Sequence, residues 1–452
     1  MNVSPIYISF FRYDRMHILH HPPRSEWSSL VQRPTLALDD MERRVGPIME
    51  AVRKRGDAAL LDYNKEFDRV ERPSLLVTEA EFAEAEKHVS NELKDAIRLA
   101  KGNIERFHEA QLHEAGYRTE RIETQPGVFC WRKSVPIQRV GLYIPGGTAP
   151  LFSTILMLGV PSALVGVPER VLCTPPQADN SIHPAILYTA NLVGVRRVIK
   201  TGGAQAIAAL TYGTETVPKV DKIFGPGNQY VTVAKQLAQR SGVAIDMPAG
   251  PSEVAVLADH TCHPAFVAAD LLSQAEHGQD SQVVFITTSE ASIQAVLTEI
   301  DRQLLLLPRG AVAEKALANS RAVLFTTMDE AIDFANEYAA EHLIIATDDA
   351  DTIAERIVNA GSIFLGHYSP ESAGDYASGT NHTLPTNGYA RAYSGVSVDS
   401  FVKKITFQRL THEGIRSIGS TVEIMAEAEG LAAHRYAVTI RKDALRSADN
   451  PA

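Results

Sequence analysis

From about residue 138, short runs of β-branched and aliphatic residues alternate with segments compatible with helix, and this alternation constrains the fold more than any other feature. The first series predicts strands at 139–144, 170–173, 196–200 and 220–224. Helices are expected between them, for example at 149–159 and 204–212. Strands separated by helices are typical of a parallel sheet covered by helices on both faces. The pattern therefore predicts a doubly wound α/β unit.

A second series of the same kind follows the first. It predicts strands at 253–258, 282–287, 322–326, 342–346 and 362–365, again with helices between them. The stretch 26–113 is expected to be helical, and after about residue 388 the strand pattern ends in helical material at 420–437. The predicted fold class is therefore α/β, with two Rossmann-like doubly wound parallel-sheet units, a helical N-terminal segment and an extended helical C-terminal tail.

These patterns divide the chain into four parts. We expect an N-terminal arm at 1–25, an α/β domain made of 26–137 and 251–386, a Rossmann-like domain at 138–250, and a C-terminal tail at 387–452. A tail that cannot form its own core packs on another surface, either its own domain or a partner subunit.

Composition excludes several classes of function. The 452 residues carry 44 Lys and Arg against 54 Asp and Glu, a formal net charge of −10, which argues against nucleic-acid binding because that function requires a clustered basic surface. The sequence contains no apolar run of the roughly 18 residues needed to cross a membrane, and no signal sequence is evident. Three widely spaced cysteines, Cys130, Cys173 and Cys262, suggest no disulfide framework. The expectation is a soluble, cytoplasmic protein that acts on small molecules.

Three glycine turns follow predicted strands of the first series, although the Gly-x-Gly-x-x-Gly fingerprint of dinucleotide enzymes is absent. The turns lie at 145–147, 202–205 and 225–228. In a parallel sheet such turns share one edge, where backbone N–H groups and helix N-termini favour a pyrophosphate. Tyr143, Gln205 and Asn228 would project there. The alternative is that these glycines only close tight turns between strand and helix.

The segment 263–278 predicts a helix with a polar pair at its end. Gln274 and His277 continue the apolar stripe of Val267 and Leu271, and at i, i+3 their side chains are close enough to bind one ion. The alternative is that His277 caps the negative end of the helix dipole.

Two further groups of polar residues lie near the strands of the second series. Glu341 and His342 stand at the start of an apolar strand, where they are placed to act as acid and base, unless they form a charged corner of a surface turn. The stretch 369–382 reads as a long polar loop, and such loops usually carry function. Asp375 offers an oxygen ligand to a metal and His382 a donor to substrate, or either residue braces the loop.

Several longer motifs occur together and in order, and through them the chain resembles the histidinol dehydrogenase family from about residue 26 onward. The motifs are VGLYIPGGTAPL at 140–151, GGAQAIAAL at 202–210, KVDKIFGPGN at 219–228, DMPAGPSE at 246–253, DLLSQAEHG at 270–278, EHL at 341–343, the stretch 369–382, and 429–434 with 437–438.

The resemblance implies a zinc-dependent oxidation of L-histidinol through histidinal to L-histidine with two NAD, the last step of histidine biosynthesis. It implies that 138–250 binds NAD and that the domain including 251–386 carries zinc. It also implies a homodimer with shared active sites, in which the tail packs on the partner subunit. One zinc ion per subunit would be held by Gln274, His277, Asp375 and, from the other subunit, His434.

The same resemblance implies roles for the remaining candidate residues. NAD would be contacted by Tyr143, Gln205 and Asn228. Glu341 and His342 would act as bases. Substrate would be held by Ser252, His382 and Glu429, together with His342 and the residues of the zinc set, Gln274, His277, Asp375 and His434.

Two departures from the family pattern are visible, Ala340 before Glu341 and Gln279 after Gly278, where proline is common.

Three rival functions are weighed against the resemblance. An NAD dehydrogenase of the same scaffold for another polar primary alcohol would not need His382, Glu429 and His434. A zinc hydrolase would leave the glycine turns unexplained. A subunit without catalytic activity would not need Glu341 and His342.

Overall fold

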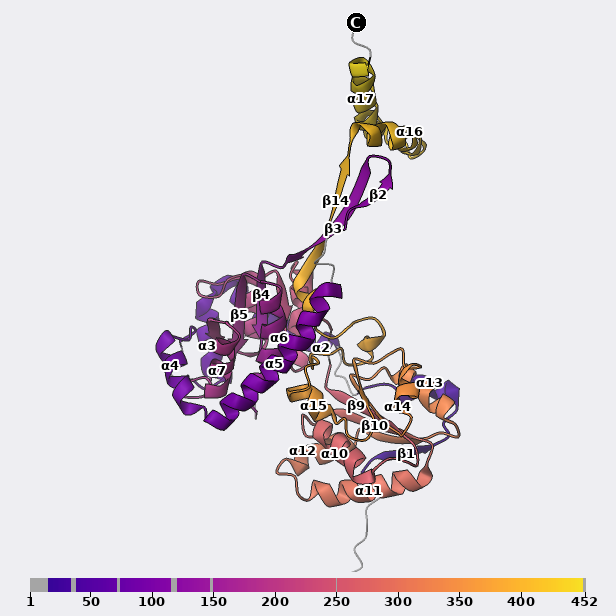
Figure 1. The fold of residues 1–452 in the computed structure, drawn as a ribbon. Coiled ribbons are helices and arrows are strands. Elements are labelled where there is room, and N and C mark those ends of the chain that lie inside the picture. Colours follow the sequence, from indigo (N-terminus) through magenta and orange to yellow (C-terminus); the bar gives the residue numbers. More distant parts are fainter. Residues whose placement is uncertain are drawn as a thin grey trace, which may run out of the picture.

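The computed structural model describes residues 15–33, 38–70, 74–114, 120–146, 149–248 and 250–449. Two α/β units lie next to each other, and an arm that contains the C-terminal helices projects away from them (Figure 1). Each unit is built on a parallel sheet, so the predicted fold class is confirmed. No helix of the described residues is long and apolar enough to span a membrane.

The first unit contains a five-stranded parallel sheet in the order β6-β5-β4-β7-β8. The strands are β4 (Arg139–Tyr143), β5 (Glu169–Thr174), β6 (Arg197–Lys200), β7 (Lys222–Phe224) and β8 (Ala244–Ile245). The helices between them are α6 (Phe152–Leu164), α7 (Pro184–Leu192), α8 (Gly203–Tyr212) and α9 (Gln229–Arg240). Alternate residues of one strand belong to two hydrophobic cores, since Val140 and Leu142 pack with α6 and α7 whereas Tyr143 packs with α8 and α9. Helices therefore cover both faces of the sheet.

The second unit contains a six-stranded parallel sheet in the order β1-β11-β10-β9-β12-β13. Its strands are β1 (His17–His20), β9 (Glu253–Ala258), β10 (Gln282–Thr287), β11 (Arg321–Leu324), β12 (His342–Ala346) and β13 (Ser362–Leu365). One face packs on α10 (Pro264–Ala275), α11 (Glu290–Leu304) and α12 (Gly310–Leu317), and the other on α1 (Arg24–Leu30), α13 (Met328–Tyr338) and α14 (Ala350–Ala354). Apart from β1, the strand order repeats that of the first unit.

The helices between residues 38 and 114 pack on the first unit, whereas the predicted domain division placed them with the second. They are α2 (Leu38–Arg55), α3 (Asp57–Phe67), α4 (Glu79–His88) and α5 (Asn91–Glu114). We expected 26–137 to share a domain with 251–386, but α2 contacts α8 and α9, α4 contacts α7, and α5 contacts α6. The apolar stripes of these helices cover the first unit, a choice of surface that periodicity alone does not indicate. Within the expected arm 1–25, residues 17–20 form an edge strand paired with β11, and residues 1–14 lie outside the described residues.

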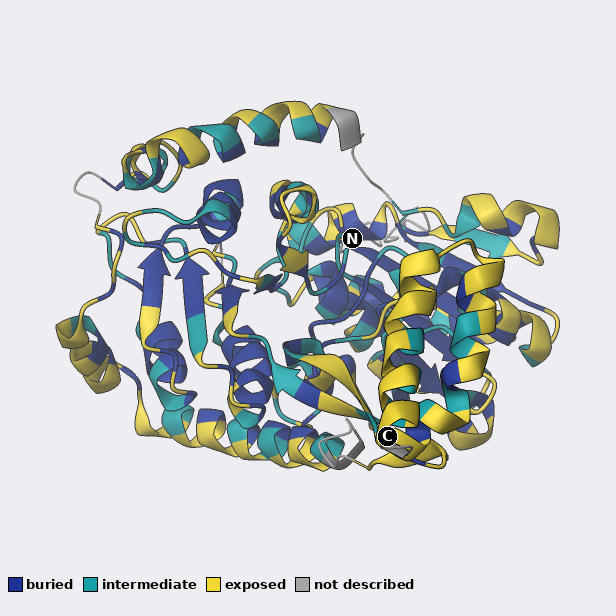
Figure 2. Ribbon diagram, turned by 90° about the horizontal axis from the view of Figure 1, so that it is seen from above, coloured by how far each residue is buried: buried dark blue, intermediate teal, exposed yellow. Residues whose placement is uncertain are grey.

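The projecting arm contains a three-stranded antiparallel sheet and a pair of helices. The elements are β2 (Ile122–Gln125), β3 (Val128–Pro136), β14 (Val402–Leu410), α16 (His412–Ala428) and α17 (Ala432–Asp449). The expectation of a tail without strands was wrong, because β14 pairs with β3 along its whole length. The two helices that end at the C-terminus are mainly exposed (Figure 2).

Candidate active site

A cavity of about 300 Å³ lies between the two units. From the first unit it is lined by the turn after β7 and by Pro145, which follows β4, so this wall is the carboxyl edge of the five-stranded sheet. Doubly wound sheets bind ligands at this edge, where the strand order reverses, here between β4 and β7. The opposite wall is the amino edge of the six-stranded sheet, with Ser252, Glu341 and His342. The end of α10 and a short helix, α15 (Glu371–Tyr376), close the cavity.

Glu341 and His342 lie side by side at the amino end of β12, as predicted, and both are buried. The backbone N–H of Glu253 donates to Glu341 Oε2 at 2.9 Å, and His342 Nδ1 donates to the Glu253 carbonyl at 3.4 Å. Burial raises the pKa of Glu341 to about 8, in the range where a carboxyl group exchanges protons at neutral pH. The alternative of an exposed charged corner is excluded.

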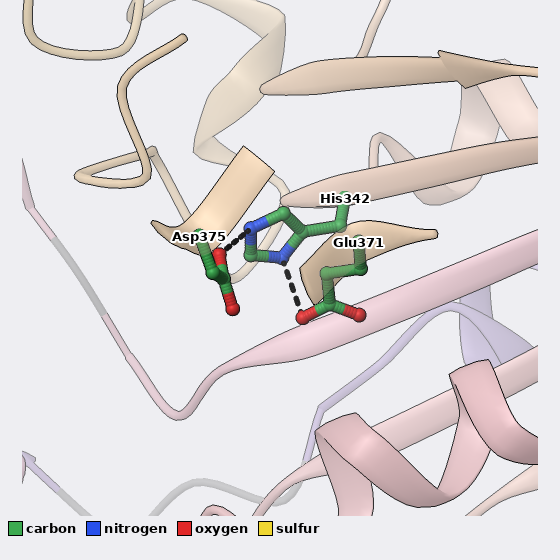
Figure 3. A group of neighbouring side chains, drawn as sticks. All are labelled: His342, Glu371 and Asp375. Atoms are coloured by element: carbon green, nitrogen blue, oxygen red, sulfur yellow. Dashed lines mark ion pairs between the residues drawn. The ribbon is translucent and has the colours of Figure 1, made fainter. Parts of the chain in front are cut away.

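The His342 ring lies between two carboxylates of α15 (Figure 3). Its Nδ1 is 3.5 Å from Glu371 Oε1, and its Nε2 is 3.6 Å from Asp375 Oδ1. Burial alone would lower the pKa of His342, but Glu371, Glu341 and Asp375 outweigh it and raise the pKa to about 10. Burial would raise the pKa of Asp375, yet the positive imidazole of His342 keeps it below its ordinary value. The ligand atoms of His342, Glu371 and Asp375 all lie within 4.8 Å of one another.

Glu371 was missed by sequence reasoning. The stretch 369–382 was expected to be a loop, whereas Glu371–Tyr376 forms a helix that begins after Pro370. Within that helix Glu371 and Asp375 are at i, i+4, so they share one face. This spacing was the available signal. Burial raises the pKa of Glu371 to about 8.

Gln274 and His277 line the same cavity from the end of α10. Gln274 lies in the last turn of the helix and is buried, and neither its side-chain oxygen nor its nitrogen has a hydrogen-bond partner among the described residues. Buried amides are normally paired, so this one indicates a partner that the chain itself does not supply. His277 follows the helix end, and the desolvation of its ring lowers its pKa, which favours the neutral imidazole that metals bind.

His382 and Ser252 also line the cavity. His382 Nδ1 donates to the backbone carbonyl of Asp375 at 2.8 Å, which leaves Nε2 to face the Thr154 hydroxyl at 3.1 Å. Burial lowers the pKa of His382. The ring is therefore neutral and fixed in one orientation beside Asp375.

The three residues expected at the nucleotide edge are not equivalent. Asn228 lines the cavity, and its side chain caps α9 by accepting from the Val231 N–H at 3.1 Å. Tyr143 and Gln205 are buried and do not line the cavity; the Tyr143 hydroxyl accepts from the Gly203 N–H at 3.0 Å. Tyr143 and Gln205 thus lie under the turn that begins α8.

A buried ion pair that sequence reasoning missed holds the turn after β7. Lys235 Nζ is 2.5 Å from Asp246 Oδ1 and donates to the Gly225 carbonyl at 2.9 Å, while Asp246 Oδ2 accepts from the Gly225 N–H at 2.8 Å. Gly225 has φ +124°, and a side chain there would meet the Tyr143 carbonyl, because a Cβ would lie 2.0 Å from its oxygen. This glycine therefore has a structural role in the turn, and it also lines the cavity.

Glu429 and His434 are not brought to the cavity of their own chain. Glu429 directly follows α16 and His434 lies in the first turn of α17, and both are exposed. The helices that carry them stand at the far end of the arm (Figure 1).

Comparisons with known proteins agree with the resemblance of the motifs. The sequence model of the family described as histidinol dehydrogenase matches residues 31–442. A histidinol dehydrogenase of Bacteroides fragilis is 57% identical over 431 residues, which cover 95% of this chain and 100% of the relative. A histidinol dehydrogenase of Bacteroides thetaiotaomicron is 56% identical over the same shares of both chains. A crystal structure of histidinol dehydrogenase from Elizabethkingia anophelis has a TM-score of 0.92 at 54% identity, covering 96% of this chain and 100% of that one.

Proposed function

Since the chain belongs to the histidinol dehydrogenase family, whose members are NAD-dependent oxidoreductases of histidine biosynthesis, we propose that its cavity oxidises L-histidinol through histidinal to L-histidine with two NAD. The observation that carries this assignment to the cavity is the buried pair Glu341 and His342 opposite the carboxyl edge of a Rossmann-like sheet. That placement sets proton acceptors against the edge where such sheets bind nucleotides. The rival zinc hydrolase has no use for this edge.

The proton acceptors have separate roles in this proposal. His342 takes the proton of the substrate alcohol in its neutral form, while NAD, when bound, would accept the hydride. A zinc ion on Asp375 would offset the charge of one of the carboxylates that raise the pKa of His342, which favours this neutral form. Glu341 then takes a proton from water as the water oxygen adds to the bound aldehyde, and the resulting hydrate anion would release hydride to a second NAD and leave the carboxylic acid. Ser252 and His382, which line the cavity, hold the substrate. Retention of the aldehyde in a closed cavity protects it from side reactions.

The donor set at the end of α10 fits a zinc ion. Gln274 has an unpartnered buried amide, His277 a neutral imidazole, and Asp375 an ionised carboxylate in the same cavity. We assign zinc to Gln274, His277 and Asp375, with His434 of the partner subunit as the fourth ligand. The ion would supply the positive charge and open coordination positions that fix the imidazole and amine of histidinol. The cluster of His342, Glu371 and Asp375 is the second candidate, but its imidazole already lies between two carboxylates.

NAD is proposed to lie along the carboxyl edge of the five-stranded sheet. Asn228 faces it directly from the start of α9. Tyr143 and Gln205 lie under the turn at 202–203, so their contact with NAD requires that this turn moves.

A homodimer with shared sites accounts for the arm. Its helices expose Ile424, Met425, Leu431 and Tyr436, an apolar surface that two helices cannot bury between themselves. We propose that a second copy covers this surface and that the arm of each chain carries Glu429 and His434 into the cavity of the other.

Metal removal tests the assignment. Chelation should abolish the formation of reduced NAD from histidinol, followed by absorbance, and added zinc should restore it together with the zinc content of the protein. Gln274→Ala should lose bound zinc, whereas Glu371→Gln should keep it. Full activity in a verified metal-free sample would exclude zinc, and the reverse pattern of the two variants would move the ion to the cluster around His342. Turnover of another polar alcohol in preference to histidinol would favour the other dehydrogenase.

A further inference from the structure

Arg33, which follows α1 in the N-terminal segment, makes a buried ion pair across the second unit. Its Nε is 2.7 Å from Glu253 Oε2 and its Nη2 is 2.8 Å from Glu253 Oε1, the bidentate arrangement in which guanidinium and carboxylate match. The Arg33 side chain is 5% exposed and that of Glu253 is 1% exposed. Glu253 therefore depends on Arg33 as its counterion.

Glu253 is also the residue whose backbone holds both proposed bases. It is the first residue of β9, which pairs with β12, so its main chain lies next to the start of β12. Its N–H donates to the Glu341 carboxylate, and its carbonyl accepts from the His342 ring. A displacement of Glu253 would move the partner of each base at once.

The Arg33 guanidinium also holds the backbone segment that leads from α13 to Glu341. Nη2 of Arg33 donates to the backbone carbonyl of Tyr338 at 2.6 Å, and the guanidinium lies over the Tyr338 ring at 3.7 Å from its centroid. Tyr338 ends α13, and the chain reaches Glu341 through Ala339, which has a left-handed backbone with φ 53°. Non-glycine residues hold this conformation only where their surroundings enforce it.

We propose that Arg33 is a positioning residue for Glu341 and His342, which acts through the Glu253 carboxylate on one side and the Tyr338 carbonyl on the other. The proposal rests on the acid and base roles assigned above. Misplacement of reacting groups by about 1 Å can cost on the order of 100-fold in rate. Loss of Arg33 should therefore appear mainly in kcat, because the substrate contacts proposed at His382 and the zinc set, and the edge proposed for NAD, lie on other elements.

Arg33 could also act only as an anchor of the N-terminal segment, and the chain offers a matched control for this structural role. Arg321 on β11 donates to the carbonyls of Leu30 and Gln32, so it anchors the same segment to the same sheet. No contact between Arg321 and Glu253 is found in the described structure. Arg321→Met therefore removes the anchor and leaves every hydrogen bond from Arg33 toward the bases, while only the longer-range effect of its charge on Arg33 and Tyr338 is lost.

The experiment compares Arg33→Met, Arg33→Lys and Arg321→Met as full-length enzyme. For Arg33→Met we expect kcat for histidinol oxidation to fall about 10- to 100-fold, with KM for histidinol and for NAD within about 3-fold and zinc content unchanged. Arg33→Lys should recover part of kcat, since an ammonium restores the charge but not the bidentate fork. Arg321→Met should keep kcat within about 2-fold of the unmodified enzyme, even if its melting temperature falls as much as that of Arg33→Met.

The double variant Arg33→Met with Glu253→Gln removes both buried charges and keeps the experiment decisive if Arg33→Met alone fails to fold. If the double variant recovers stability but its kcat stays low, the result supports the positioning role of Arg33. If kcat also recovers, the proposal is overturned, because the unpaired charge of Glu253 would then explain the loss of kcat in Arg33→Met. Equal loss of kcat in Arg321→Met and Arg33→Met would also overturn it. Glu341→Gln in the same assay separates the two proposals. If it stays active, the base assignment fails, whereas an inactive Glu341→Gln beside an unaffected Arg33→Met defeats only the positioning role.

Discussion

At the residue scale, burial gives Glu341 a role that an exposed glutamate could not have. Its carboxyl group has one backbone donor, Glu253 N–H, and no arginine or lysine partner among the described residues, so burial raises its pKa to about 8. A group with a pKa near the working pH both accepts and releases protons readily.

Glu341→Gln should therefore slow the oxidation of histidinal by roughly 10² to 10⁴, the usual range for a lost general base, and slow that of histidinol less. The amide keeps the shape and still accepts from Glu253 N–H, so the change isolates proton transfer. Each half-reaction is measured separately by the appearance of reduced NAD. Equal losses in the two steps would contradict the division of labour with His342.

Asp68 provides a test of burial away from the cavity. It directly follows α3, its Oδ2 has no hydrogen-bond partner among the described residues, and burial raises its pKa from 3.8 to about 6. A carboxyl whose pKa is raised by folding destabilises the folded state above pH 6, and the penalty disappears below pH 3.8. Asp68→Asn should therefore raise the melting temperature at pH 7.5, and raise it less at pH 5. A gain that is the same at both pH values would refute the assignment.

The residues that sequence reasoning found and missed differ in a physical way. Glu341, His342, Gln274 and His277 interrupt apolar patterns, so their polarity is visible in the sequence itself. Arg33 lies in no such pattern, and only its three-dimensional partner Glu253, 220 positions away, gives it a role.

At the element scale, the turn after β7 joins the first unit to the cavity. Gly225 and Gly242 both have positive φ, +124° and +84°, but only Gly225 lies against another strand. Each Gly→Ala change carries the backbone strain of about 1–3 kcal/mol.

Gly225→Ala should cost more in the free energy of unfolding than Gly242→Ala, because its Cβ would also displace the Tyr143 carbonyl. It should also raise KM for NAD, since this turn lines the cavity. Urea denaturation and steady-state kinetics of the two variants provide the comparison. Equal free energies of unfolding for the two variants and an unchanged KM for NAD would contradict this prediction. They would show that the close contact of Gly225 with the Tyr143 carbonyl matters neither for stability nor for NAD binding.

Elements were predictable where burial enforces a pattern. The central strands are buried on both faces, so β9, β10 and β12 read as continuous apolar runs and were placed with the bounds that the structure shows. β14 has almost no buried residue, and its structure depends on pairing with β3 and on contacts such as the stack of Phe407 on Trp131. Pairing between distant segments leaves no periodic signal in either one.

At the scale of the whole molecule, the distance of the arm from the cavity determines whether one chain has a complete site. Gln274 lines the cavity, whereas His434 lies on the exposed arm. In the proposed dimer, each site takes Gln274 from one subunit and His434 from the other.

Gln274→Ala and His434→Ala homodimers should each be inactive, because every site lacks a ligand. After the two are unfolded and refolded together, random pairing should make about half of the dimers mixed and restore about a quarter of all sites. Zinc content and NAD reduction measure the recovery. An inactive mixture in which mass spectrometry detects heterodimers would rule out the shared site.

The pairing of β14 with β3 also has a consequence for how the chain is made. Val402 lies opposite Pro136, so β3 leaves the ribosome long before its partner has been synthesised. At synthesis rates of about 5–20 residues per second the interval is on the order of tens of seconds. Throughout it, one edge of β3 is open, and open strand edges are templates for pairing with other chains. Each nascent chain is therefore exposed to association with its neighbours on the same messenger RNA before it can complete its own arm.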